Sequence, residues 1–138
     1  MANRVTYLLD TNAISHLMRA DPRIEGWMAG LHPQDRVVTC VIVRGEILFG
    51  ISRLPEGRRK TELEQAGRQF LAAFPCEPVL ERAGDFYAAI KLARHRHGLT
   101  LDENELWVAA TAQALDAALV TRDRDFSGID GLMVVAPV

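Results

Sequence analysis

The sequence predicts an α/β fold with a central, mainly parallel sheet of about five strands, covered by helices on both faces. Short apolar and β-branched runs alternate along the 138 residues with longer segments that have helical periodicity or helix-capping residues. Such alternation is typical of parallel strands joined by crossover helices. A hydrophobic content of 49% supplies enough apolar side chains for one core of this kind.

The first half of the chain contains two predicted strands and three predicted helices. In order, they are a strand at 5–9, helices at 11–20 and 21–30, a strand at 36–43 and a helix at 44–54. Thr11 or Asn12 is the expected N-cap of the first helix. Asp21 and Pro22 are expected to open the second helix, and Gly30 to end it. Both strands are apolar on both faces, as in a buried parallel sheet.

The second half adds three helices and three strands. In order, they are a charged amphipathic helix at 55–74, a weak strand at 76–80, a helix at 81–98, an alanine-rich helix at 102–116 and strands at 117–121 and 132–138. The 81–98 helix is expected to bury Phe86, Ile90 and Leu92 and to end at Gly98. Five strands result, interleaved with helices.

The composition argues against several classes of protein. No apolar run approaches the roughly 20 residues of a membrane span, and strand-like sequence begins too near the N-terminus for a signal peptide. Cys40 and Cys76 are expected to be reduced core cysteines of a cytosolic protein. The formal net charge of −2 is not that of a strongly basic domain, so an RNA substrate would require local basic residues or a second subunit.

Acidic residues follow the predicted strands near the points where the strands end. They are Asp10 after the first strand, Glu46 in the helix after the second, Asp102, Glu103 and Glu105 at the start of the alanine-rich helix, and Asp123 and Asp125 after the strand at 117–121. The carboxyl ends of parallel strands share one edge of the sheet, where ligands bind. We therefore expect up to seven carboxylates in one region.

Such a group of carboxylates repels itself, and a divalent cation relieves the repulsion. Mg²⁺ and Mn²⁺ favour carboxylate and water ligands, whereas a zinc site would include His or Cys. The usual chemistry of such a site is phosphodiester hydrolysis by an activated water. Each acid also has a simpler interpretation as a helix cap. Capping is adequate for Asp102 but explains Glu46, which has apolar neighbours, less well.

Four motifs carry a family resemblance: LLDTNAIS, VRGEILFGI, ELWVAATAQAL and LVTRDRDF. In this order they resemble the PIN-domain ribonucleases, and more narrowly the VapC-like toxins of bacterial toxin–antitoxin modules. The resemblance implies a single PIN-like domain over residues 1–138, folded as a three-layer α/β/α sandwich. It also implies a cytoplasmic homodimer that cleaves RNA with Mg²⁺ or Mn²⁺ and is neutralised by a cognate antitoxin.

The resemblance also implies which acids are catalytic metal ligands. Asp10, Glu46 and Asp123 match the first, second and fourth acidic positions. At the third position these toxins usually carry aspartate, whereas this sequence offers Glu105, whose extra methylene displaces the carboxylate. Mg²⁺ tolerates poor geometry badly, so Glu105 is expected to bind through water, to favour Mn²⁺ or to weaken the site. Asp102, one helical turn earlier, is expected to substitute or to assist.

Four further residues lie beside these acids in the sequence. The resemblance suggests that Asn12 and Thr121 orient the carboxylates through hydrogen bonds, although helix capping and strand-end packing are competing explanations. Arg44 and Arg122 lie near strand ends and suit RNA phosphates, or else offset the charge of the acids. The antitoxin is expected to dock on the apolar and basic surfaces around residues 14–27 and 49–54.

Two other functions are compatible with parts of the pattern. If Glu105 spoils the metal site, the chain is a weak or inactive PIN-like module that binds RNA or a protein partner. A phosphatase with Asp10 as its nucleophile would require a second aspartate two residues on, where Asn12 stands. Mn²⁺ titration separates the first alternative from a nuclease, because a working site stabilises the fold when the cation binds.

Overall fold

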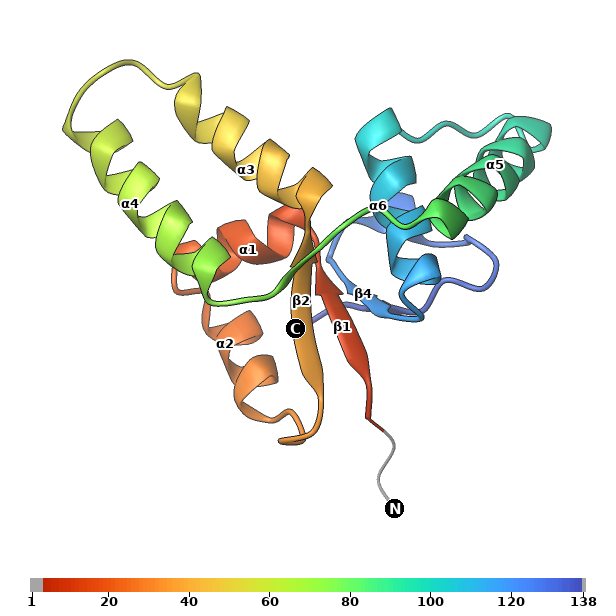
Figure 1. The fold of residues 1–138 in the computed structure, drawn as a ribbon, viewed down its shortest axis with the longest axis horizontal. Helices are drawn as coiled ribbons and strands as arrows, with labels where there is room; N and C mark the ends of the chain where they lie inside the picture. Colours follow the sequence, from red (N-terminus) through yellow and green to blue (C-terminus); the bar gives the residue numbers. More distant parts are fainter. Residues whose placement is uncertain (1–3, 138) are drawn as a thin grey trace.

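A five-stranded sheet with only parallel pairings organises the fold. The computed structural model describes residues 4–137. The strands are β1 (Thr6–Leu9), β2 (Arg36–Cys40), β3 (Cys76–Glu77), β4 (Ala118–Val120) and β5 (Val134–Val135). Their order is β3-β2-β1-β4-β5, which places β1 at the centre, between β2 and β4 (Figure 1). The predicted fold class, with about five parallel strands, is confirmed.

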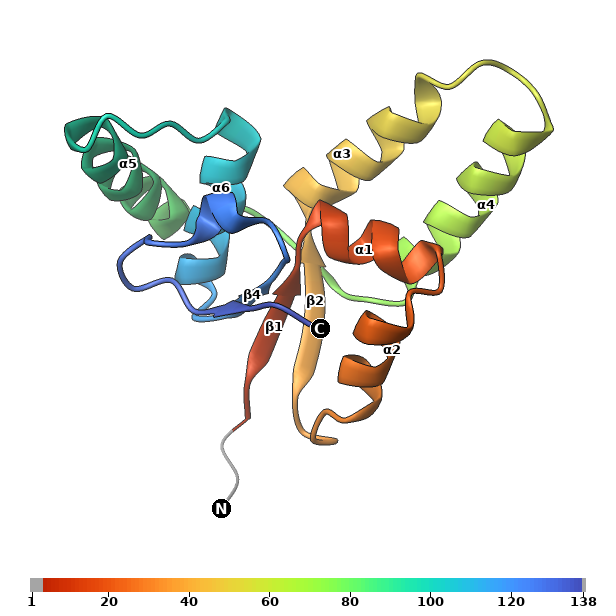
Figure 2. The ribbon, with the colours of Figure 1, turned by 180° about the vertical axis from the view of Figure 1, so that it is seen from behind.

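Helices connect these strands and flank the sheet. They are α1 (Thr11–Met18), α2 (Pro22–Ala29), α3 (Val41–Ser52), α4 (Arg58–Ala72), α5 (Glu81–Arg96) and α6 (Glu103–Ala114), and the short 3₁₀ helix η1 (Arg124–Phe126) follows β4. Figures 1 and 2 show α1 to α4 grouped on one side of the β1–β2 pair and α5 with α6 on the other. The sheet therefore forms the middle layer of an α/β/α sandwich.

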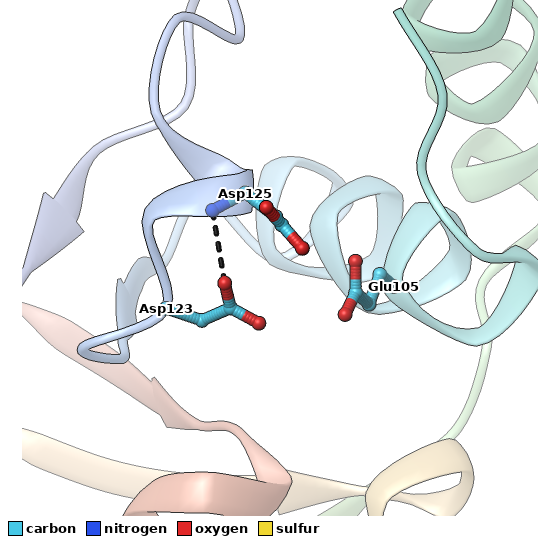
Figure 3. Close-up of side chains that lie close together, drawn as sticks. All are labelled: Glu105, Asp123 and Asp125. Atoms are coloured by element: carbon cyan, nitrogen blue, oxygen red, sulfur yellow. Dashed lines mark hydrogen bonds between the residues drawn. The ribbon is translucent and has the colours of Figure 1, made fainter.

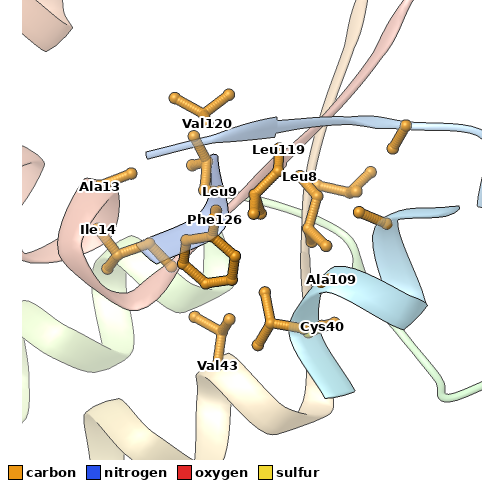
Figure 4. Packing of buried hydrophobic residues seen from close by; sticks show 14 of the residues in the cluster. Leu8, Leu9, Ala13, Ile14, Cys40, Val43, Ala109, Leu119, Val120 and Phe126 are labelled. Atoms are coloured by element: carbon orange, nitrogen blue, oxygen red, sulfur yellow. The ribbon is translucent and has the colours of Figure 1, made fainter. Parts of the chain in front are cut away.

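The buried core joins the central strands to the elements that follow them. Leu8 of β1 and Leu119 of β4 are completely buried, and Figure 4 shows Ile14 of α1, Val43 of α3 and Phe126 of η1 in the same cluster. Burial of a side chain of this size contributes about 1.5–3 kcal/mol each. This packing fixes the starts of α1 and α3 and the η1 turn relative to the sheet.

The register of the sheet brings the carboxyl ends of three strands to one edge. Tyr7 of β1 pairs with Val37 of β2 and with Ala118 of β4. Just beyond the strands, the backbone N–H of Asp10 donates to the carbonyl of Val120 at 3.3 Å. The residues after β1, β2 and β4 therefore emerge side by side, as the sequence predicts.

Three expectations about individual elements are wrong in detail. The strand predicted at 36–43 ends at Cys40 and continues directly as α3, because the neighbouring strands pair with it no further than Cys40. Leu92 is 51% exposed, because it follows the buried Ile90 by two residues and so lies on the opposite face of α5. Cys76 is exposed on the two-residue edge strand β3, although both cysteines are free, as predicted.

The C-terminal strand is shorter than predicted, and residue 138 of the predicted 132–138 strand lies outside the described residues. Gly98 adopts φ +67° two residues after α5, which explains why the helix ends there. None of the described helices is both long enough and apolar enough to cross a membrane.

Candidate metal centre

Asp10 occupies the junction between β1 and α1 and is only 4% exposed. Its Oδ1 accepts a hydrogen bond from the backbone N–H of Ala13 at 2.7 Å, which makes Asp10 the N-cap of α1. The prediction of Thr11 or Asn12 as the cap is therefore wrong. No residue separates Asp10 from the helix, and its extended backbone places the side chain over the first turn.

Thr121, directly after β4, connects Asp10 to Asp123. Its hydroxyl oxygen accepts a hydrogen bond from the backbone N–H of Asp123 at 3.0 Å. The same hydroxyl donates to the Asp10 carboxylate and lowers the pKa of that group. Thr121 is 1% exposed, so this bridge is enclosed in the core. The bridge gives Thr121 the geometry that an orienting residue requires.

Glu46 approaches the site from the second turn of α3. Its Oε1 accepts a hydrogen bond from the Thr11 hydroxyl at 2.8 Å, which ties α3 to the start of α1. Glu46 is half-buried, and its charge helps to raise the pKa of Asp10. The two carboxylates are therefore near enough to repel each other, although Asp10 precedes α1 and Glu46 lies in α3.

Glu105, Asp123 and Asp125 form a compact acidic group on the other side of β1. Each residue has a carboxylate oxygen that lies within 4.8 Å of a carboxylate oxygen of the other two, so the three oxygens are mutually close. Figure 3 shows Glu105 of α6 facing the turn after β4, where the backbone N–H of Asp125 donates to Asp123 Oδ1 at 2.9 Å. Oxygen ligands of one octahedral Mg²⁺ lie roughly 2.9 Å apart when adjacent and roughly 4.2 Å apart when opposite, so the three side chains would have to draw closer together to bind one cation directly.

The structure gives Asp102 and Glu105 different places. Asp102 is the exposed N-cap of α6, and its Oδ1 accepts a hydrogen bond from the Asn104 backbone N–H at 2.7 Å. Glu105, one turn further along, is half-buried and reaches Asp123. Of the two candidates for the third acidic position, Glu105 therefore lies in the group, while Asp102 repels it from the capping position.

Burial and mutual repulsion raise the pKa of two of these acids. Burial is the largest cause that raises the pKa of Asp10 to about 6, and the charges of Asp123 and Glu46 add to it. Burial also raises the pKa of Glu105 to about 7, with repulsion from Asp123, Asp102 and other carboxylates. A divalent cation would relieve this repulsion. The donors are all carboxylate oxygens, so the residues present fit Mg²⁺ or Mn²⁺.

The remaining predicted site residues are Arg122, Arg44 and Asn12, and they flank the acids. The Arg122 Nη2 donates to Asp21 Oδ2 at 2.8 Å, so its guanidinium is held against the N-cap of α2. Arg44 is half-buried on α3, and Asn12 is exposed in the first turn of α1. The proposed contacts of these arginines with RNA, and the orienting role of Asn12, stay predictions.

One contributor, Thr11, was not identified from the sequence, and another, Asp125, was expected in the acidic region but not among the metal ligands. Thr11 holds Glu46, but its partner depends on how α1 meets α3, which no local pattern reveals. Asp125 belongs to the seven acids expected in one region, and the alternation of Asp123 and Asp125 in the TRDRDF motif is the signal that both could bind the cation. A tight turn after a strand brings such alternate side chains together.

Comparisons with known proteins show which family the chain resembles. The PIN domain family profile matches residues 7–132. Ribonuclease VapC1 of Haemophilus influenzae (strain R2866) is 30% identical over 131 residues, which cover 91% of this chain and 93% of the relative. Toxin FitB of Neisseria gonorrhoeae (strain ATCC 700825 / FA 1090) is 29% identical over 121 residues, covering 84% and 86%.

A solved structure supports the same assignment. The structure of VapBC-1 from nontypeable Haemophilus influenzae matches with a TM-score of 0.85 and 25% identity, over 96% of this chain and 98% of that chain. The similarity in fold therefore extends over nearly the whole chain. The chain belongs to the PIN domain family and resembles its VapC-like toxins.

Proposed function

We propose that this chain is a Mg²⁺- or Mn²⁺-dependent endoribonuclease that acts as the toxin of a toxin–antitoxin pair. One observation carries the proposal: Glu105, Asp123 and Asp125 gather in one acidic group beyond the carboxyl ends of the strands. Asp10 and Glu46, from two further segments, lie outside that group but near enough for their charges to be felt by its members. The relatives named ribonuclease VapC1 and toxin FitB support the same reaction and the same biological role.

In this proposal, Glu105, Asp123 and Asp125 hold the cation directly, and Asp10 and Glu46 complete its surroundings. A bound divalent cation would supply an activated water and polarise the scissile phosphate. The raised pKa values of Asp10 and Glu105 mean that both acids lose protons readily only near neutral pH or above. Cation affinity should therefore rise between about pH 6 and pH 7.

RNA must approach an acidic site on a chain of net charge −2. Arg124, exposed in η1 beside Asp123, and Arg44 on α3 are the arginines that we propose to contact its phosphates. Arg122 is less available, because it pairs with Asp21. Binding through a few arginines should weaken as salt increases.

A groove next to the acidic site is the proposed seat of the antitoxin. It lies between α1, α3 and α4, has a volume of about 910 Å³, and includes Glu46 at one end. Phe49, 66% exposed, contributes to an apolar lining, and Arg19, Arg53 and Arg59 add positive charge. A partner segment with apolar and acidic side chains fits this lining, and its continuation would cover Glu46.

The antitoxin proposal is testable with any small protein that is found to be encoded beside this gene. Coexpressed with this chain, it should copurify and suppress RNA cleavage, and Phe49→Asp should weaken both effects. The exposed Leu92→Asp, on a helix outside the groove, is the matched control. Equal inhibition of the Phe49→Asp variant would count against the groove. We also propose that the chain is cytoplasmic and forms a homodimer. Light scattering of the purified chain would test the homodimer.

The nuclease proposal is tested by cleavage of total cellular RNA with Mn²⁺, Mg²⁺ or EDTA. We expect cleavage with either cation and none in EDTA. Asp10→Asn should reduce the rate of RNA cleavage by more than the roughly 10–100-fold that removal of a supporting residue costs. Asp85→Asn, an exposed acid on α5, should cleave normally. Cleavage in EDTA or by the Asp10→Asn variant would contradict the proposal, and RNA binding without any cleavage would favour the inactive module.

A further inference from the structure

Arg94 of α5 reaches across to the turn that carries Asp123 and Asp125. Its Nη2 donates to the backbone carbonyl of Asp125 at 2.9 Å, and its Nη1 to the carbonyl of Ser127 at 3.4 Å. Phe126, the residue between these carbonyls, is buried in the core. The turn is therefore held by one apolar side chain from within and by one guanidinium across both flanking residues.

The contacts of Arg94 indicate a geometric role rather than charge compensation. Within residues 4–137 its guanidinium makes no ion pair, and its hydrogen bonds go to carbonyl oxygens. Its Nε is buried without a hydrogen-bond partner, which costs stability. A planar guanidinium offers donors in a rigid arrangement, which a lysine ammonium does not reproduce. Two carbonyls two residues apart match this arrangement.

The helix that carries Arg94 is packed on the helix that carries Glu105. Contacts between α5 and α6 are the most extensive between any two elements of the described chain. Lys91 of α5 reinforces this pairing through an ion pair with Glu103 of α6 at 2.7 Å. Arg94 consequently connects the α5–α6 pair to the turn after β4. These are the two segments whose carboxylates must meet at the candidate metal centre.

We propose that Arg94 is a positioning residue for the candidate metal centre. It holds the Asp123–Ser127 turn at the distance from α6 at which Glu105, Asp123 and Asp125 can share one cation, an inference that rests on the proposed function. Without a cation the three carboxylates repel one another, and this repulsion pushes the turn away from α6. The two bonds from Arg94 oppose that movement and keep the site assembled before the cation binds.

The experiment compares Arg94→Ala and Arg94→Lys with a control, Arg96→Ala. Arg96 is exposed on the same helix. Its substitution by alanine removes the same charge as Arg94→Ala but leaves the bonds from Arg94 to the turn in place. Isothermal titration with Mn²⁺ measures cation affinity, and hydrogen exchange in EDTA measures the protection of backbone amides at residues 122–128. The exchange measurement reports on the turn even when no cation is present.

We expect Arg94→Ala to weaken Mn²⁺ binding roughly 10-fold and to speed amide exchange in the turn. Arg94→Lys should show most of the same loss of affinity, because it keeps the charge but not the planar donors. If Arg94→Ala fails to fold, Arg94→Lys alone tests the inference. Arg96→Ala should match the wild type. Wild-type affinity and exchange in both Arg94 variants would overturn the inference alone, whereas absence of Mn²⁺ binding by the wild type would overturn the proposed function.

Discussion

Asp10 and Asp123 follow adjacent parallel strands, yet the structure secures them in different ways. Asp10 passes directly into α1, and its buried carboxylate is bonded by the Ala13 N–H and the Thr121 hydroxyl. Asp123 opens a short turn, is half-buried, and belongs to a group of three repelling carboxylates. The carboxylate after β1 is therefore enclosed in the core, whereas the carboxylates after β4 project from a turn that Phe126 anchors to the core.

This difference has a consequence for stability. A pKa raised from 3.8 to about 6 means that the ionised Asp10 costs the folded protein about 3 kcal/mol relative to the unfolded chain. That cost is a large part of the 5–15 kcal/mol typical of a domain. A buried acid that is held in place before the cation arrives thus destabilises the empty protein, and the charge of a nearby cation would offset that cost.

The largest expected effect comes from neutralising the buried acid. Asp10→Asn keeps a capping side chain but removes the buried charge, so at pH 8 in EDTA we expect the free energy of unfolding to rise by up to about 3 kcal/mol. Asp123→Asn should change it much less, because that side chain is more exposed. Urea denaturation measures both. Equal changes in the two variants would remove the distinction between the two sides of the site.

A second effect concerns pH and Glu105. Its pKa is raised from 4.5 to about 7 in the folded protein, so the native state holds this proton over a range in which the unfolded chain has lost it. The stability contributed by Glu105 in EDTA therefore falls as pH rises from about 4.5 to about 7, and is constant above that. Comparison with Glu105→Gln isolates this contribution in thermal melts. A wild type that gains stability over Glu105→Gln as pH rises would contradict the assignment.

The smallest expected effect is loss of the Thr11–Glu46 hydrogen bond. Thr11→Val keeps the shape of the side chain and should cost about 1 kcal/mol of stability, together with a severalfold loss of Mn²⁺ affinity. Thr61→Val is a matched control, since it removes a hydroxyl that donates to the Gly57 carbonyl on α4, away from the acids. Titration calorimetry compares the two variants. Similar Mn²⁺ affinities would show that Glu46 is held adequately without Thr11.

The fold was predictable because local patterns and strand connectivity agree along the chain. The apolar run before Asp10 indicates a buried strand, and Asp21 with Pro22 marks a helix start that the structure confirms. The strand predicted at 36–43 was too long, because β-branched residues favour strands wherever they occur, whereas the ends of the neighbouring strands decide where pairing stops.

The site was predictable only as far as topology determines it. Parallel strands bring Asp10 and Asp123 to one edge, so their proximity follows from the order of the elements. Contacts between helices do not follow in this way. The bond from Thr11 to Glu46, and the reach of Arg94 to the turn after β4, depend on helix packing angles that no local sequence pattern contains.

Calorimetric titration of the metal-free chain with Mn²⁺ at pH 8, beside the Asp10→Asn/Asp123→Asn double variant, examines both sides of the site at once. If carboxylates from β1 and β4 share a cation, the wild type binds Mn²⁺ saturably and gains thermal stability, and the double variant does neither. Equal Mn²⁺ binding by the two proteins would place any cation elsewhere and contradict the proposed metal centre.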